Sequence, residues 1–134
     1  MNFIAKIVGI VFMILIVSCG HNLKLEDILN NEKEFELKIP QGDPYTSNKS
    51  IIKTIKQDSE KILKLKNWFK NNPYHWHSSI ASYILPEYTL IGNDFRLLVY
   101  KNFIVIGFKD KEGHAQQYTK QINKLEFDFL LEKL

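Results

Sequence analysis

The sequence predicts an α+β domain in which one main helix packs on an antiparallel meander of five or six strands. Residues 59–71 repeat apolar side chains at helical spacing, and residues 95–100 and 103–108 are two β-prone runs joined by two polar residues. A helix and a set of strands that each have one apolar face bury those faces against one another. An open sheet and a curled half-barrel both fit this pattern.

The first strand is expected at residues 35–39, where apolar and polar side chains alternate until Pro40 ends the run. Residues 50–56 fit either a strand or an extension of the following helix. We favour a strand, because residues 58–60 (Asp-Ser-Glu) form a new helix start of their own.

The main helix is expected from about Ser59 to Asn71. Asp58 or Ser59 is suited to cap its first amides, and Ile62, Leu65 and Phe69 recur at i, i+3 and i+7. The helix stops at residues 71–73 (Asn-Asn-Pro), because proline cannot continue it.

The rest of the chain is expected to be mostly strands. The two runs at 95–100 and 103–108 are apolar on both faces, so they are predicted to be central and covered by the helix on at least one side. Gly113 supplies the left-handed position of the turn after them. The expected elements are strands at 76–85, 88–91, 95–100, 103–108 and 114–122, the last at the sheet edge, and a short helix at 125–134.

The N-terminus has the pattern of an export signal. A short start with Lys6 precedes an unbroken apolar run from Ile7 to Val17. Eleven residues are too few to cross a bilayer as a helix, which needs about 20. A cleaved signal is therefore expected rather than a permanent membrane span.

The four residues Ile16-Val17-Ser18-Cys19 follow this apolar run and resemble the bacterial lipobox. The resemblance implies diacylglycerol transfer to the Cys19 thiol and cleavage between Ser18 and Cys19. Cys19 is the one cysteine in the chain, which excludes an internal disulfide. By resemblance to enterobacterial sorting rules, Gly20 after Cys19 implies the outer membrane, facing the periplasm, in a Gram-negative host.

The expected organisation is a lipoprotein signal peptide at 1–18, a lipidated Cys19 with a polar tether at 19–34, and one globular domain at 35–134. An alternative for the tether is a short amphipathic turn that docks on the domain through Leu23, Leu25, Ile28 and Leu29. Without the signal, 17 basic and 15 acidic residues remain. This balance gives no basic face, so nucleic-acid binding is not expected.

No motif in the mature region predicts catalysis or a cofactor. The serines at 78, 79 and 82 lie in no nucleophile motif, and the glycines form no phosphate-binding loop. His75 and His77 share one face if they lie in a strand, and they are weak candidates for metal ligands. They have no defined third ligand, so solvent-facing histidines are the simpler interpretation, and neither an enzyme nor a metal site is predicted.

Aromatic residues cluster between positions 68 and 88. Tryptophan and tyrosine dominate binding hot spots, but they also fill cores, and the core is the expected place for Trp68. The candidates for contact with a partner are Tyr74, Trp76, Tyr83 and Tyr88.

These patterns together predict a membrane-tethered envelope lipoprotein that binds a protein and has no enzymatic activity, such as an inhibitor, immunity or accessory protein. The mature region resembles small uncharacterised bacterial lipoproteins in format and no specific family. The alternative is a carrier of a small ligand or metal. A large apolar pocket beneath the helix would favour this alternative.

Overall fold

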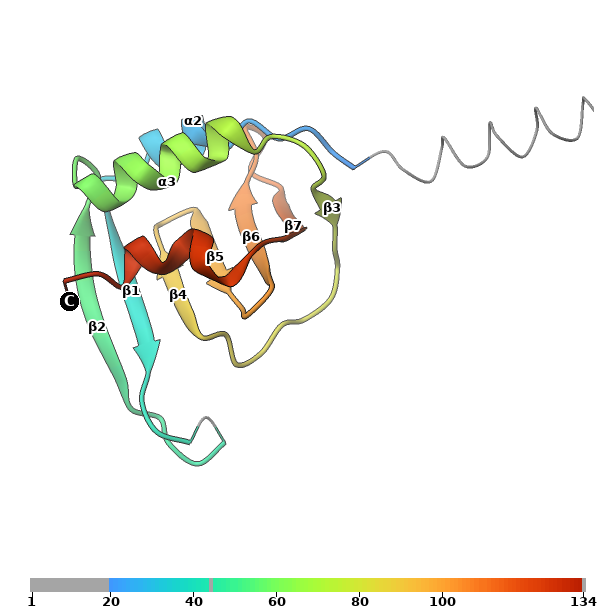
Figure 1. Ribbon diagram of the computed structural model, residues 1–134. Coiled ribbons are helices and arrows are strands. Elements are labelled where there is room, and N and C mark those ends of the chain that lie inside the picture. Colours follow the sequence, from blue (N-terminus) through green and yellow to red (C-terminus); the bar gives the residue numbers. More distant parts are fainter. Residues whose placement is uncertain (1–19, 44, 134) are drawn as a thin grey trace, which may run out of the picture.

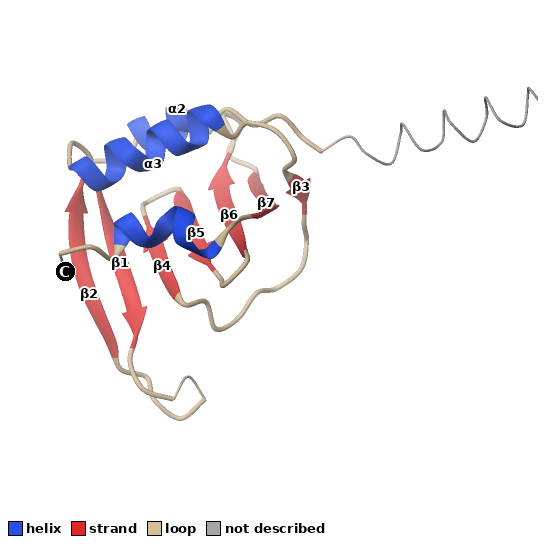
Figure 2. Cartoon of the chain, in the orientation of Figure 1, coloured by secondary structure: helices blue, strands red, loops and turns tan. Residues whose placement is uncertain are grey.

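The computed structural model describes residues 20–43 and 45–133 (Figures 1 and 2). The expected signal segment and Cys19 lie outside the described residues. The described helices are α2 (Glu26–Asn30), α3 (Glu60–Asn71) and a 3-10 helix, η1 (Lys124–Leu130). The strands are β1 (Glu34–Pro40), β2 (Ser50–Lys56), β3 (His77–Ser78), β4 (Tyr88–Ile91), β5 (Phe95–Val99), β6 (Phe103–Lys109) and β7 (Ala115–Gln121).

The described strands form one antiparallel sheet in the order β2-β1-β4-β5-β6-β7-β3. This confirms the α+β class, and β5 and β6 are central as expected. The sheet has seven strands, one within or overlapping each range where a strand was expected, rather than the five or six of the predicted meander. Strands β2 and β3 are the two edges of this sheet, so the described strands do not close into a barrel.

The helices bury one face of this sheet. Strand side chains alternate between two faces, and Leu37, Leu90, Leu97 and Ile106 follow one another across four neighbouring strands in register. All four are fully buried in the core that α3 and η1 cover. On η1, the Phe127 ring meets the Trp68 ring of α3 edge-on at 4.7 Å.

Helix α3 confirms the predicted main helix. The Ser59 side chain caps it by accepting a hydrogen bond from the amide of Ile62. The predicted apolar positions Ile62, Leu65 and Phe69 are at most 1% exposed. The local sequence was sufficient here because the cap, the helical spacing and the final Pro73 all indicate the same boundaries.

The N-terminal segment differs from the expected tether. Residues 20–34 pack on the domain, and Leu25, which directly precedes α2, and Leu29 within α2 are buried in the common core. Ahead of α2, the His21 amide donates to the Trp76 carbonyl at 2.6 Å and the Leu23 amide to the Pro73 carbonyl at 2.9 Å. The alternative of a docked amphipathic turn is therefore what forms, because its apolar side chains have core surface to cover.

Glu32 fixes the end of this segment. It is 3% exposed, and its two carboxylate oxygens accept the amides of Asn93 and Asp94 at 2.7 and 2.8 Å. A Cβ on Gly92 would lie 2.6 Å from the Glu32 carboxyl carbon, so only glycine leaves room for this contact. The segment expected to be a polar tether thus holds the β4–β5 turn through charge-assisted hydrogen bonds.

The strand expected at 76–85 is mostly a loop. Only His77 and Ser78 pair with β7, after which the chain leaves the sheet edge. The next strand, β4, lies on the other side of β5, β6 and β7, so the chain cannot continue along the edge and also reach it. Strand β7 is also not the edge strand that was expected, since β3 pairs with part of it.

We predict that Leu29→Ala destabilises the protein by about 3 kcal/mol, because it leaves a cavity beside a fully buried side chain. Denaturant unfolding measures this change. The matched control is Asn30→Ala, an exposed site on the same helix where we expect a change within about 0.5 kcal/mol. Equal, small effects at both positions would mean that the segment is a detached tether.

Candidate functional site

The second face of the sheet carries the candidate site. Among the described residues no helix covers this face, and its side chains alternate with those of the core. The cross-strand row of Glu36, Ile91, Arg96, Gly107 and Gln117 lies on it, in register from β1 to β7. We call this surface the open face.

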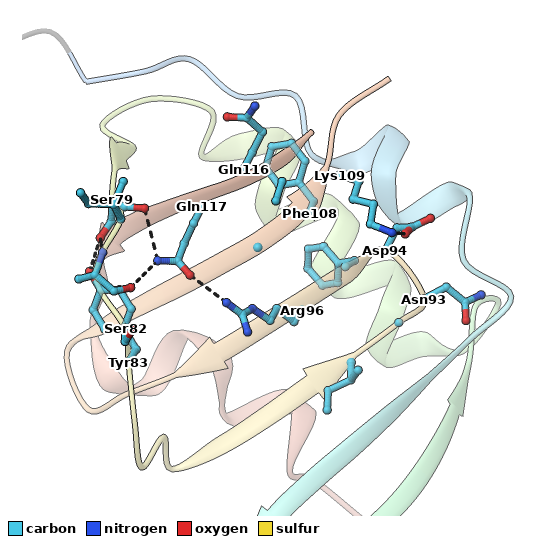
Figure 3. A pocket seen from close by; sticks show the side chains of 17 residues that line it. Ser79, Ser82, Tyr83, Asn93, Asp94, Arg96, Phe108, Lys109, Gln116 and Gln117 are labelled. Carbon is cyan, nitrogen blue, oxygen red and sulfur yellow. Dashed lines mark hydrogen bonds and ion pairs between the residues drawn. The ribbon is translucent and has the colours of Figure 1, made fainter. Parts of the chain in front are cut away.

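Residues 79–86, which we call the strap, run beside the open face between β3 and β4 (Figure 3). The Ser79 amide donates to the Gln117 carbonyl at 3.0 Å, and Gln117 Nε2 donates to the Ala81 carbonyl at 2.8 Å. These two bonds attach the start of the strap to β7.

The later part of the strap rests on the β5–β6 turn. The Tyr83 ring lies 6.0 Å from Phe103 and 6.3 Å from Tyr100, which stack on each other. The Tyr100 hydroxyl donates to the Ile84 carbonyl at 3.2 Å. Burial raises the pKa of Tyr100, with a further contribution from Tyr83, so ionisation of this hydroxyl is disfavoured.

A groove of about 670 Å³ lies between the strap and the open face. Its walls are residues 79–83 of the strap and the β4–β5 turn, and its floor comes from β5, β6 and β7. The volume is within the range of ordinary ligand sites, but the groove is open to solvent and not an enclosed cavity. An open groove of this kind suits part of a larger partner better than an enclosed small molecule.

Arg96 is the central polar group of this groove (Figure 3). Its side chain lies over Gly107, where a Cβ would come within 2.9 Å of Arg96 Nε. Arg96 Nη2 donates to Gln117 Oε1 at 2.9 Å, while the amide nitrogen of the same Gln117 side chain holds the strap. The glycine therefore makes room for the guanidinium and the glutamine orients it.

The other charges lining the groove neutralise each other. Lys109 Nζ and the Asp94 carboxylate form an ion pair at 3.0 Å at the end near the β4–β5 turn. In the part of the chain that the structure describes, no carboxylate lies within 4.0 Å of the Arg96 guanidinium. The positive charge of Arg96 is thus uncompensated in the groove.

Aliphatic side chains border the same groove. Ile80 on the strap is fully exposed, and Ile91 on β4 is 37% exposed beside Arg96. Farther along the strap, Ile84 is 74% exposed. Apolar side chains beside one oriented charge are typical of protein-binding surfaces, in which an apolar centre excludes water from a few polar contacts.

The four aromatic residues predicted to contact a partner lie in different places in the structure. Tyr83 lines the groove, and Tyr74 is exposed at 61% on a different part of the surface. Trp76 and Tyr88 are corrected to core residues, at 0% and 3% exposed. Trp76 Nε1 donates to the Asn72 carbonyl and the Tyr88 hydroxyl to the Phe127 carbonyl, so each polar group is satisfied inside the protein.

His75 and His77 do not lie together in one strand, as the weak metal-ligand hypothesis required. His75 precedes β3 with a φ of 63°, outside strand geometry, whereas His77 lies in β3. Both are exposed. Within residues 20–43 and 45–133, no group of three or more His, Cys, Asp or Glu side chains is arranged to hold a metal ion.

A second depression, of about 600 Å³, lies between β2, the start of α3 and the end of η1. Its lining is mainly charged and includes Lys53, Lys56, Lys61 and Lys64. Lys61 Nζ is already occupied, because it donates to the carbonyls of Leu130 and Glu132. Its mostly charged lining residues differ from the large apolar pocket beneath the helix that would favour a small-ligand carrier.

The sequence reasoning missed Arg96, Gly107 and Gln117. One signal was present, because Arg96 is the sole arginine of a lysine-rich chain and it interrupts an apolar strand. Neither Gly107 nor Gln117 carries a local signal, since their roles come from the register that places them beside Arg96.

Comparisons with protein-family models, with curated proteins and with solved structures give no match to this chain. Among the described helices, none is both long enough and apolar enough to span a membrane.

We predict that Gln117→Leu increases the rate at which chymotrypsin cleaves the strap by about fivefold, because the lost hydrogen bond to the Ala81 carbonyl stabilises the attached strap by about 1 kcal/mol. Limited proteolysis with mass spectrometry of the cut sites measures this rate. The control is Gln121→Leu, an exposed site on the same strand without a bond to the strap. Equal cleavage of both variants would contradict the role given to Gln117.

Proposed function

We propose that this protein is a lipid-anchored envelope protein that binds a partner protein in the groove beside its open face and has no enzymatic activity of its own. The observation that carries the binding function is the groove itself, with an oriented and uncompensated Arg96 between exposed aliphatic side chains. Inhibitors, immunity proteins and accessory subunits of the envelope are the classes that fit this proposal.

The form of the groove supports a protein partner. Partner surfaces contribute side chains that project into an open groove, whereas small-molecule sites usually enclose most of their ligand. The floor is built on paired strands, so Arg96 and Gln117 are held in place before binding. A site that is already ordered loses little conformational entropy when a partner binds.

The lining of the groove gives a reason to favour binding over catalysis. Its charged residues are Arg96 and the Lys109–Asp94 pair, in which the carboxylate is exposed and paired with lysine. A general acid or base usually has a pKa that its surroundings have shifted towards the working pH. Burial of the group is one cause of such a shift. The open, solvated setting of this pair is the ordinary one for a surface ion pair.

The proposed anchor at Cys19 is supported by the basic start, the apolar run and the residues Ile16-Val17-Ser18-Cys19. The structure adds a consequence for the geometry. Gly20 packs against the backbone of His75, with a Cβ position only 2.7 Å from the His75 Cα. If Cys19 carries lipid, its attachment point directly precedes a segment docked on the domain, and no long tether separates the domain from the bilayer.

We test the groove by site-specific photo-cross-linking in intact cells, with a benzophenone amino acid in place of Ile80. We expect one main adduct whose cross-linked peptide maps to a single segment of one envelope protein. The matched control places the same group at Leu63, which is 55% exposed on α3, and should give no such adduct. Equal adducts from both positions, or none from Ile80, would contradict binding in the groove.

We predict that Cys19→Ala abolishes the lipid modification and moves the protein out of the membrane fraction, because only the cysteine thiol accepts the diacylglycerol group. Intact-mass measurement and membrane fractionation give the result. Ser18→Ala is the control, since it keeps a small side chain at the cleavage site and should be processed normally. An unchanged mature mass and location of the Cys19→Ala variant would disprove the anchor.

A further inference from the structure

Arg96 has the properties of a recognition group rather than of a general surface charge. It is the one arginine among 18 basic residues, and its guanidinium is a planar fork that matches a carboxylate with two parallel hydrogen bonds. Lysine offers a point charge without this geometry. The chain thus has its single fork-shaped cation on the floor of the groove beside the strap.

The guanidinium is positioned but not saturated. Gly107 leaves the space in which the side chain lies, and Gln117 accepts a hydrogen bond from Nη2. A guanidinium has five N–H donors. Among the described residues this is the one hydrogen bond of the Arg96 side chain, so further donors remain available to a ligand.

The charge of the groove determines which sign of charge a bound ligand should carry. Lys109 and Asp94 neutralise each other, and no described carboxylate lies within 4.0 Å of Arg96. The complementary group for an oriented, unpaired guanidinium is an anion, and the one that a protein partner supplies is a carboxylate.

The side chains next to Arg96 indicate which residue types should lie on either side of the carboxylate in the ligand. Ile91 is its direct cross-strand neighbour on the open face, and Ile80 on the strap lines the opposite wall. In an extended peptide, side chains at i and i+2 point the same way. Aliphatic side chains two positions from an acidic one would therefore meet these isoleucines.

We infer that the groove recognises an extended acidic segment of the partner protein, in which one carboxylate pairs with the Arg96 guanidinium and aliphatic side chains on either side contact Ile80 and Ile91. Gly107 and Gln117 are positioning residues for this contact. The inference rests on the proposed binding function of the groove and adds the chemistry of its ligand.

The test uses the full-length protein in detergent micelles with ¹⁵N-labelled arginine. Because the chain has one arginine, the spectrum contains one arginine Nε–H signal, which belongs to Arg96. The probe is the acetylated and amidated peptide Val-Ser-Glu-Ser-Val, and the reference probe carries Gln in place of Glu. We expect the Glu peptide to shift the Nε–H signal saturably and to bind at least about tenfold more tightly than the Gln peptide.

Two variants separate recognition from simple charge attraction. Arg96→Lys keeps the charge but loses the fork, and Gly107→Ala keeps arginine but fills its space, so both should weaken binding of the Glu peptide severalfold. For Arg96→Lys and its control, binding is followed through the backbone amides of Gly107 and Gln117 in uniformly labelled protein. The control is Lys38→Gln, which removes a positive charge from the same face outside the groove and should leave affinity unchanged.

The outcomes are distinct. Equal affinity for the two peptides would overturn the carboxylate inference while leaving the groove as a binding site. No saturable shift with the Glu peptide would also overturn it, and the cross-linking at Ile80 would still judge the proposed function separately. An equal loss with Lys38→Gln would show that overall charge, and not Arg96, attracts the probe.

Discussion

Helices α3 and η1 bury their apolar side chains against the same face of the sheet, and the other features of the molecule follow from this one-sided burial. Each core strand must send alternate side chains to the opposite face, and the composition of that face is free to serve a different purpose. In this protein it combines charged residues such as Glu36, Lys38 and Arg96 with a few aliphatic ones. The core and the candidate site are thus two faces of the same strands.

The sheet order produces the groove. Strand β3 pairs at one edge, while β4, the next strand along the chain, lies between β1 and β5. The connection must pass three strands to reach its place, and the strap does so beside the open face, where no described helix lies. Its bonds to Gln117 and its contact with the Tyr100–Phe103 stack hold it there. A covering segment without regular structure then forms a wall, while the paired strands form a rigid floor.

The docked N-terminal segment connects the proposed lipid anchor to the proposed binding groove. Leu29 and Glu32 attach residues 20–34 to the core and to the β4–β5 turn, and the Asn93 and Asp94 held by Glu32 also line the groove. One end of the binding site is therefore stabilised by the segment that follows the proposed lipid attachment at Cys19. We expect a domain anchored in this way to present its groove close to the membrane.

The sequence by itself determined the local elements: the α3 helix with a cap at Asp58 or Ser59, the β5–β6 hairpin, the turn at Gly113, where φ is 84°, and the α+β class. It also contains, outside the described residues, the segment from which we propose the export signal and the lipid anchor. These features depend on side-chain period, capping and turn chemistry within short windows. Only the tertiary structure decided that residues 20–34 pack on the domain, that 76–85 is mainly a strap, and that Trp76 and Tyr88 are buried. The same is true of the Arg96, Gly107 and Gln117 cluster, because it depends on the pairing of strands distant in sequence, and no local pattern encodes which strands become neighbours.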